Sequence, residues 1–186
     1  MSTHATPQHR AYTWQDPRPT AEAIGRMSGL EVLHGIGRGT LPTPPAMDTL
    51  AIEPAEIEPG RTVFELTPAG WHYNALGTVH GGVLATLADN ALGAAVHTRL
   101  PAGSGYTTQG LTITFLRPVT VDTGRIRCEA TAVHVGRRSA YATATVTDLI
   151  GRLLAHATTT CLIFRADGRQ PARTREQATQ GTSPTA

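Results

Sequence analysis

The 186-residue sequence has little charge, few aromatic side chains and only two cysteines. Charged residues make up 16% of it, and the formal net charge is +2, which is too small to indicate a nucleic-acid partner. We interpret Cys128 and Cys161 as buried thiols in a reducing cytosol, although a secreted protein could pair them. No run approaches the roughly 20 apolar residues of a membrane span, and the first residues lack a signal-peptide core. We therefore expect a cytoplasmic protein with no membrane partner.

Both ends of the sequence are polar and rich in residues that cannot bury a core. We expect residues 1–20 and 167–186 to be disordered or loosely docked. Residues 21–33 have apolar positions at helical spacing, and a Pro-rich loop follows at residues 41–48. We expect residues 21–48 to pack on the core. Residues 49–166 are long enough for one compact domain.

Within that domain, one long helical pattern stands among several strand patterns. Residues 50–57 and 61–67 flank Glu58-Pro59-Gly60, which predicts a hairpin. Residues 81–98 lack proline and place their large apolar residues at helical spacing. Four β-rich runs follow, and the glycines between them are typical of an antiparallel meander; the runs are residues 106–116, 125–135, 139–148 and 153–164. The pattern predicts an α+β domain with one central helix and a sheet of five or six strands.

The central helix carries one charged residue, Asp89. A helix at a protein surface has a charged outer face, so this helix should be buried on nearly all sides. Sheet would cover one face, and a partner subunit would be the simplest cover for the other. An unpaired buried carboxylate is costly, so such residues persist for a structural pair or for chemistry. The helix alone does not decide between these two roles.

The start of this helix favours chemistry. His80-Gly81-Gly82 puts two residues without side chains where the first turn exposes unpaired N–H groups, which suits an oxyanion hole. Asn74, six residues before His80, could donate a second hydrogen bond, although an Asn in a loop commonly satisfies a turn. His80 could cap the helix or support the site. None of these residues is accompanied by other residues at the spacing of a metal-ligand set, so we predict no metal site and no cofactor.

The combination Asn74–x5–His80-Gly81-Gly82–x6–Asp89 resembles the signature of the hotdog-fold acyl-CoA thioesterases of the phenylacetic acid degradation (PaaI) type. Residues 115–119, 136–142 and 151–160 resemble the matching strands of that family. The resemblance covers residues 50–164. It implies a hotdog fold, in which an antiparallel sheet wraps around the central helix. It also implies a homodimer, often paired again into a homotetramer, with the site at the dimer interface.

The resemblance also assigns roles to residues. Gly81 N–H and the Asn74 amide would polarise the thioester carbonyl, and Asp89 of the facing subunit would act as general base or as nucleophile. A hydroxyl on the strand after the helix would position water. Both Thr107 and Thr108 qualify. The spacing to Pro118 favours Thr108, and a bulge at Gly110 would reconcile that choice with strand alternation.

A basic turn completes the expected site. Arg137, Arg138 and Ser139 begin a strand where the family contacts the CoA phosphates, and guanidinium groups suit phosphate, although a solvated basic turn is an equally good explanation. The expected catalytic residues are Asp89, Asn74, Gly81, His80 and Thr108, and the expected substrate-binding residues are Gly82, Arg137, Arg138 and Ser139.

These residues predict hydrolysis of a small aryl or medium-chain acyl-CoA to the free acid and CoA. One alternative is a hotdog hydratase or dehydratase acting on an enoyl thioester, for which His80 and Asp89 could supply the two groups. Asn74 and the spacing of the signature argue against it. The other alternative is a non-catalytic acyl-CoA-binding protein on the same fold. The acyl group, and the role of the residues before Leu50, do not follow from the sequence.

Overall fold

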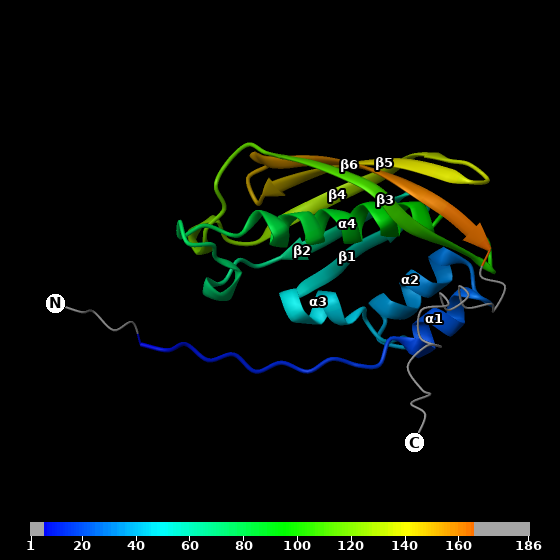
Figure 1. Cartoon of the computed structure of the whole chain (residues 1–186), viewed down its shortest axis with the longest axis horizontal. Helices are drawn as coiled ribbons and strands as arrows, with labels where there is room; N and C mark the ends of the chain where they lie inside the picture. Colours follow the sequence, from blue (N-terminus) through cyan, green and yellow to red (C-terminus); the bar gives the residue numbers. More distant parts are fainter. Residues whose placement is uncertain (1–5, 166–186) are drawn as a thin grey trace, which may run out of the picture.

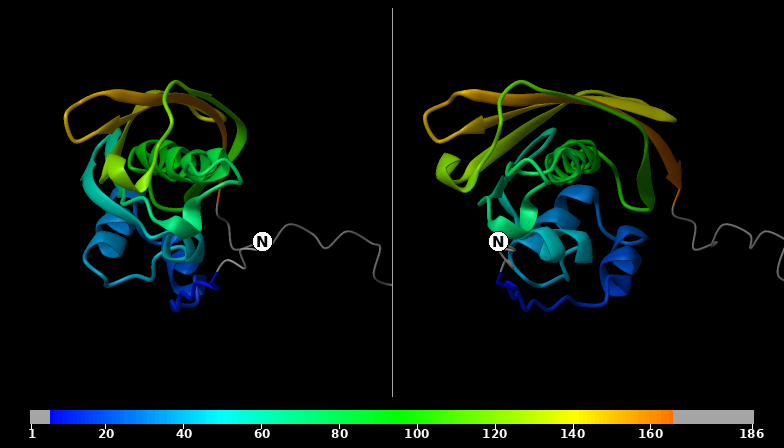
Figure 2. Two further views of the ribbon diagram at one scale, coloured as in Figure 1. Left: turned by 90° about the vertical axis from the view of Figure 1, so that its left-hand side faces the viewer. Right: turned by 60° about the vertical axis from the view of Figure 1, so that its left-hand side comes forward.

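A curved six-stranded antiparallel sheet wraps over one long helix, and three short helices lie on the far side of that helix (Figure 1). The structure is a computed structural model that describes residues 6–165. Figure 2 shows the three layers edge-on: the sheet, the central helix α4 (Gly81–His97), and the N-terminal helices. The α+β hotdog class and the central helix are therefore confirmed.

All six strands lie close to the predicted ranges. The strands are β1 (Ile52–Glu58), β2 (Arg61–Leu66), β3 (Ser104–Phe115), β4 (Ile126–Val135), β5 (Ser139–Asp148) and β6 (Leu153–Arg165). The hairpin between β1 and β2 turns at Gly60, whose φ of 82° favours glycine. The sheet order is β1-β2-β4-β5-β6-β3. The expected meander is thus wrong at one point: β3 crosses to the far edge and pairs with β6 instead of β4.

The N-terminal residues form three helices where one helix and a loop were expected. They are α1 (Arg18–Ile24), α2 (Gly29–Gly37) and α3 (Pro45–Leu50). The single helix over residues 21–33 is wrong because Ser28 and Glu31 form a capping box that starts a new helix. The Pro-rich segment is partly helical because Pro45 fits the first turn of α3. Residues 6–17 contain no helix or strand, and the predicted C-terminal tail, residues 167–186, lies outside the described residues.

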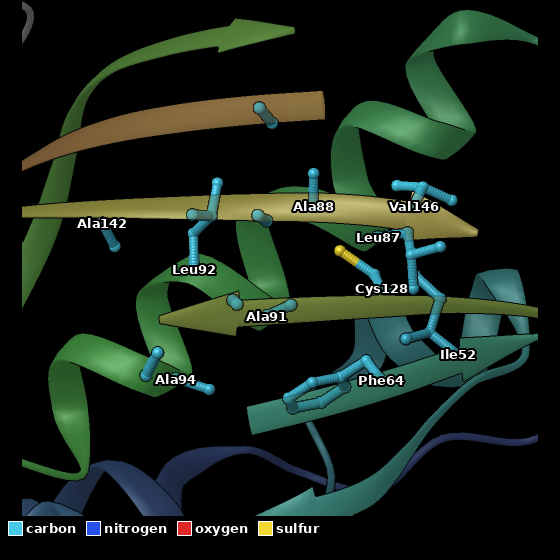
Figure 3. Packing of buried hydrophobic residues seen from close by; sticks show 14 of the residues in the cluster. Ile52, Phe64, Leu87, Ala88, Ala91, Leu92, Ala94, Cys128, Ala142 and Val146 are labelled. Atoms are coloured by element: carbon cyan, nitrogen blue, oxygen red, sulfur yellow. The ribbon is translucent and has the colours of Figure 1, made fainter. Parts of the chain in front are cut away.

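The apolar side of α4 packs against the concave face of the sheet. Leu84, Leu87, Ala88, Ala91 and Leu92 are almost completely buried. Figure 3 shows several of them against Phe64 of β2 and against Ala142 and Val146 of β5. Cys128 and Cys161 are free buried thiols, and burial raises the pKa of Cys128 to about 12.

The N-terminal helices dock on α4 through backbone contact. The Gly29 N–H donates to the Leu100 carbonyl oxygen at 3.0 Å, and a Cβ on Gly29 would overlap the His97 carbonyl group. Only glycine allows such close approach. These helices therefore cover part of the face of α4 that we expected a second subunit to cover. Between residues 6 and 165, no helix is long and apolar enough to cross a membrane, and no group of three acidic, His or Cys side chains could hold a metal ion.

Candidate active site

Asp89 and Thr108 meet between α4 and β3. The Thr108 hydroxyl donates to Asp89 Oδ1 at 2.8 Å, and both residues are half-buried. The pairing of β3 with β6 shifts by one residue between Thr108 and Gly110, as the expected bulge requires. The bulge turns Tyr106 and Thr108 to the same side of the strand as Leu111. Thr107 is exposed and has no recorded hydrogen bond to Asp89.

The surroundings of the Asp89 carboxylate are mainly apolar or already hydrogen-bonded. Burial raises the pKa of Tyr106, and the negative charge of Asp89 adds to the rise. Burial is also the main cause that raises the pKa of Cys161, which lies opposite Thr108 in the sheet, and Asp89 contributes again. The Asn90 side chain donates to the Thr86 carbonyl within the helix. Within residues 6–165, Asp89 Oδ2 accepts no hydrogen bond, so this oxygen is free to receive a proton or a ligand.

Asn74 organises the loop that precedes α4. Its Oδ1 accepts hydrogen bonds from the backbone N–H groups of Leu76 at 2.8 Å and Thr78 at 3.3 Å. Its Nδ2 donates to the Thr78 hydroxyl at 3.0 Å. Asn74 therefore does satisfy a turn. An amide nitrogen has two N–H donors, so one is left over for a ligand. Asn74 and Gly81 line the same cavity of about 360 Å³, beside Leu84.

The three residues at the start of α4 differ in what they can offer. His80 is the N-cap, and its Nδ1 accepts from Gly82 N–H at 2.9 Å. The Gly82 N–H is therefore already used. The Gly81 N–H donates to no protein atom within the described part of the chain. A Cβ on Gly81 would come within 3.0 Å of the Phe115 ring, so glycine lets this backbone lie against the wall of the cavity. Of the two glycines, Gly81 offers the open donor.

Within one chain, the Gly81 donor and the Asp89 carboxylate are too far apart to act on one carbonyl group. They are eight residues apart on α4, which is roughly 12 Å along the axis and roughly 80° around it. A reacting carbonyl needs a donor within about 3 Å. The chain therefore presents two half-sites on one helix. Asn74 and Gly81 form the first, and Asp89 and Thr108 form the second.

A large cavity opens beside the second half-site. It has a volume of about 560 Å³ and lies between α4 and β3 on one side and the N-terminal helices on the other. Thr108 and Asn90 line it, as do His97 and Tyr106 deeper along the two elements. We call this cavity the apolar chamber, because most of its lining residues are apolar. His97 is only 6% exposed, its Nε2 has no hydrogen-bond partner in the described residues, and burial lowers its pKa to about 4.

Two groups of arginines differ in what surrounds them. Arg61, Arg125, Arg127 and Arg152 form salt bridges with acidic side chains. Arg137 instead lines a cavity of about 540 Å³ with Arg99 and Arg165, and among residues 6–165 no acidic residue lines it. We call it the arginine cavity. Arg138 and Ser139 are exposed beside it but do not line it. Phe164 lines both the arginine cavity and the apolar chamber, so the two are neighbours.

Comparison with known proteins decides the family. The sequence matches the Thioesterase superfamily over residues 76–155. A variant of the phenylacetic acid degradation protein PaaI from Thermus thermophilus is 30% identical, with a TM-score of 0.58, and the match covers 64% of this chain and 98% of that chain. The chain belongs to the thioesterase superfamily. The PaaI resemblance seen in the sequence is thereby confirmed.

Two further structures share the fold. A thioesterase-like protein related to phenylacetic acid degradation, from Ralstonia eutropha, is 27% identical with a TM-score of 0.64, and the match covers 69% of this chain and 97% of that chain. Escherichia coli PaaI is 19% identical with a TM-score of 0.63 over 80% of this chain and 96% of that chain, which shows the fold alone. No curated protein matches the sequence.

The sequence motifs did not reveal the part of the site that the N-terminal helices form, and the family match does not include these helices either. Residues 76–155 contain Gly81, Asp89, Thr108 and Arg137, but not the N-terminal helices. The Thermus thermophilus and Ralstonia eutropha structures are matched over almost their whole length, whereas about a third of this chain lies outside each match. The apolar chamber, with His97 on its wall, went unrecognised because it forms only when residues 18–50 dock on α4. The only sequence signal for His97 was its place at the end of the apolar helix.

Proposed function

We propose that this member of the thioesterase superfamily hydrolyses an acyl-CoA thioester to the free acid and CoA. The observation that carries the proposal is the position of Asp89. It is the one charged side chain on α4, and its Oδ1 accepts a hydrogen bond from the Thr108 hydroxyl at 2.8 Å. Thr108 and the next residue on α4, Asn90, line the large apolar chamber. A carboxylate in that setting suits general base or nucleophilic catalysis.

The active unit in this proposal is at least a homodimer. Two copies of α4 running antiparallel, with the two-fold axis at Ala85, would bring Gly81 of one copy opposite Asp89 of the other, because the two residues are equally far from Ala85. The side of α4 that faces away from both the sheet and the N-terminal helices is half-buried or exposed and consists of small residues, which permits close approach; they include Gly82, Ala85 and Thr86. The open edge of β3 supports the same arrangement, since an unpaired edge strand can pair with its own copy.

In the joined site, the chemistry is that of acyl transfer to water. Gly81 N–H and the spare Asn74 N–H of one subunit would bind the carbonyl oxygen as negative charge develops on it. Asp89 of the other subunit would take a proton from water, whose oxygen bonds to the acyl carbon. The C–S bond then breaks, and the CoA thiolate takes up the proton. In the nucleophilic variant, Asp89 forms a mixed anhydride that water then cleaves.

The arginine cavity supports recognition of the CoA nucleotide. Arg99, Arg137 and Arg165 bring three guanidinium groups to one cavity, and the part of the chain that the structure describes adds no acidic residue to its lining. Guanidinium groups pair with phosphate oxygens through two parallel hydrogen bonds. A surface turn that served only solubility would not need to line a cavity.

The decisive experiment measures thiol release from a panel of acyl-CoA esters. Wild-type protein should release CoA with at least one aryl or medium-chain ester, Asp89→Asn should be strongly impaired, and Asp122→Asn, an exposed carboxylate outside the site, should match wild type. Hydration of an enoyl-CoA without thiol release would favour the hydratase alternative. Binding of acyl-CoA with no turnover would show a binding protein and would contradict the proposal.

A further inference from the structure

The N-terminal helices build two-fifths of the wall of the apolar chamber. Eight of its 19 lining residues lie between Thr20 and Met47. Ile24 of α1, Leu33 and Ile36 of α2 and Met47 of α3 face the chamber from that side. Without these helices the chamber would be an open surface of α4 and β3.

The chamber begins where the proposed chemistry takes place. Thr108, which holds Asp89, and Asn90, the next residue on α4, both line it. An acyl carbon next to the carboxylate would therefore have its chain directed past these two residues into the chamber. The far wall is closed by apolar side chains of the N-terminal helices and by Phe64 of β2. Apart from His97, Tyr106 and a few hydroxyl and amide groups, the wall offers an acyl group only apolar contact.

The volume indicates the size of the group. At the roughly 30 Å³ that one water molecule takes in the liquid, 560 Å³ corresponds to roughly 19 waters. An acetyl or propionyl group would leave most of that space unfilled. At a similar volume per carbon, a chain of about ten carbons, or an aryl group with a short spacer, would fill roughly half of it. Volumes in this range are usual for pockets that enclose a whole drug-sized ligand.

We propose that the apolar chamber is the acyl-binding site, and that the N-terminal helices make this enzyme selective for large apolar acyl groups of about ten carbons. This inference rests on the proposed thioester hydrolysis. It assigns to residues 18–50 a direct part in substrate selection. The chamber wall that these helices supply, eight of the 19 lining residues, is the feature on which this selectivity depends.

The test uses one substitution that fills the chamber and one matched control on the same helix. Ile24→Trp puts an indole into the chamber from α1, and Glu22→Trp puts it on the exposed side of α1. A single methylene in an apolar pocket already changes discrimination by about tenfold or more. Ile24→Trp should therefore lower kcat/KM for decanoyl-CoA at least about tenfold and leave kcat/KM for propionyl-CoA within about twofold. Glu22→Trp should leave both unchanged.

A second substitution works in the opposite direction. Met47→Ala enlarges the chamber and should move the preferred chain toward longer acyl groups, for example from decanoyl toward dodecanoyl. Equal losses by Ile24→Trp for all chain lengths would indicate that the chamber holds the pantetheine arm instead, and would overturn the proposal. Unchanged chain-length preference in both variants, with circular dichroism showing intact folds, would overturn it as well.

A binding measurement distinguishes an error in the acyl-site proposal from an error in the proposed hydrolysis. Calorimetry with decanoyl-CoA on Asp89→Asn protein measures the chamber without turnover. If wild-type protein hydrolyses no ester and Asp89→Asn still binds decanoyl-CoA at least tenfold more tightly than propionyl-CoA, the chamber assignment stands and the proposed function falls. If neither the acyl length nor Ile24→Trp changes the affinity, the chamber assignment falls whatever the activity.

Discussion

We expect the free energy of unfolding of this protein to fall at low pH because of His97. Replacing this one residue should remove that part of the pH dependence. The ring is 6% exposed, its Nε2 has no partner within the described residues, and burial lowers its pKa from 6.5 to about 4. The neighbouring ring, that of Tyr106, lies 5.5 Å away between centroids. No acidic residue contributes to the shift, since burial is its only cause.

The direction in which pH changes the free energy of unfolding depends on which state, folded or unfolded, binds the proton. Above pH 6.5 the ring is neutral in both the folded and the unfolded chain, so it adds no pH dependence. As pH falls below 6.5, the unfolded chain binds a proton that the folded chain does not, and the free energy of unfolding falls. The full loss, reached below the folded pKa, is about 3 kcal/mol for a shift of this size. At pH 5 about 2 kcal/mol of it should already be lost.

Urea unfolding followed by circular dichroism at pH 7 and pH 5 measures this loss at fixed protein concentration. His97→Phe has no titrating ring and removes a buried polar atom without a partner, so it should be at least as stable as wild type at pH 7. Between pH 7 and pH 5 it should lose about 2 kcal/mol less than wild type. The exposed His156→Gln is the control. Equal losses in wild type and His97→Phe would refute the reasoning, because His72, whose pKa burial also lowers, is common to both.

Four further predictions concern the site. Asp89→Asn should keep the fold, because the change is nearly isosteric, and lower kcat about 10²–10⁴-fold in the thiol-release assay; turnover near wild type would remove Asp89 from the mechanism. Asn74→Ala should cost at most roughly 2.7–4 kcal/mol of transition-state stabilisation, since Gly81 N–H remains. After dissociation and reassociation, a mixture of Asp89→Asn and Asn74→Ala subunits should recover about a quarter of wild-type activity, because half of the dimers are mixed and each has one intact site. Residual Asn74→Ala activity is subtracted, and no recovery after verified subunit exchange would show that each site is complete within one chain. Arg137→Ala and Arg138→Ala should raise KM for CoA esters with little change in kcat, whereas thioesters without the nucleotide phosphates should be insensitive; equal effects on both substrates would make these arginines structural.

The elements with a strong local pattern were predictable from the sequence. The helix of residues 81–98 has a continuous apolar spacing, and the β1–β2 hairpin has a turn tripeptide between two short strands, so each is specified by neighbouring residues. The break between α1 and α2 was missed because it depends on one capping box at Ser28. The position of β3 beside β6 was missed because strand order depends on contacts between distant residues.

In the candidate site, too, the features with a local sequence pattern were predictable and those that depend on distant residues were not. The Asp89 half-site was found because a lone charge on an apolar helix is visible in the sequence, and the bulge near Gly110 was inferred from a conflict in strand alternation. Taken alone, Asn74 was expected to satisfy a turn, and the structure shows that its Oδ1 accepts the hydrogen bonds of that turn while one N–H of its amide stays spare. The apolar chamber could not be predicted, because its two walls come from segments that are far apart in the chain.

The backbone contact at Gly29 fixes the distance between the N-terminal helices and α4. A side chain at that position would meet the His97 carbonyl group, so the two parts cannot slide or separate slightly without losing the Gly29–Leu100 hydrogen bond. This contact therefore helps to set the width of the chamber between them. Under the two proposals above, acyl selectivity and hydrolysis would reside in separable pieces of one chain. Exchanging the first 50 residues between relatives would be a route to new substrate ranges that leaves the catalytic helix untouched.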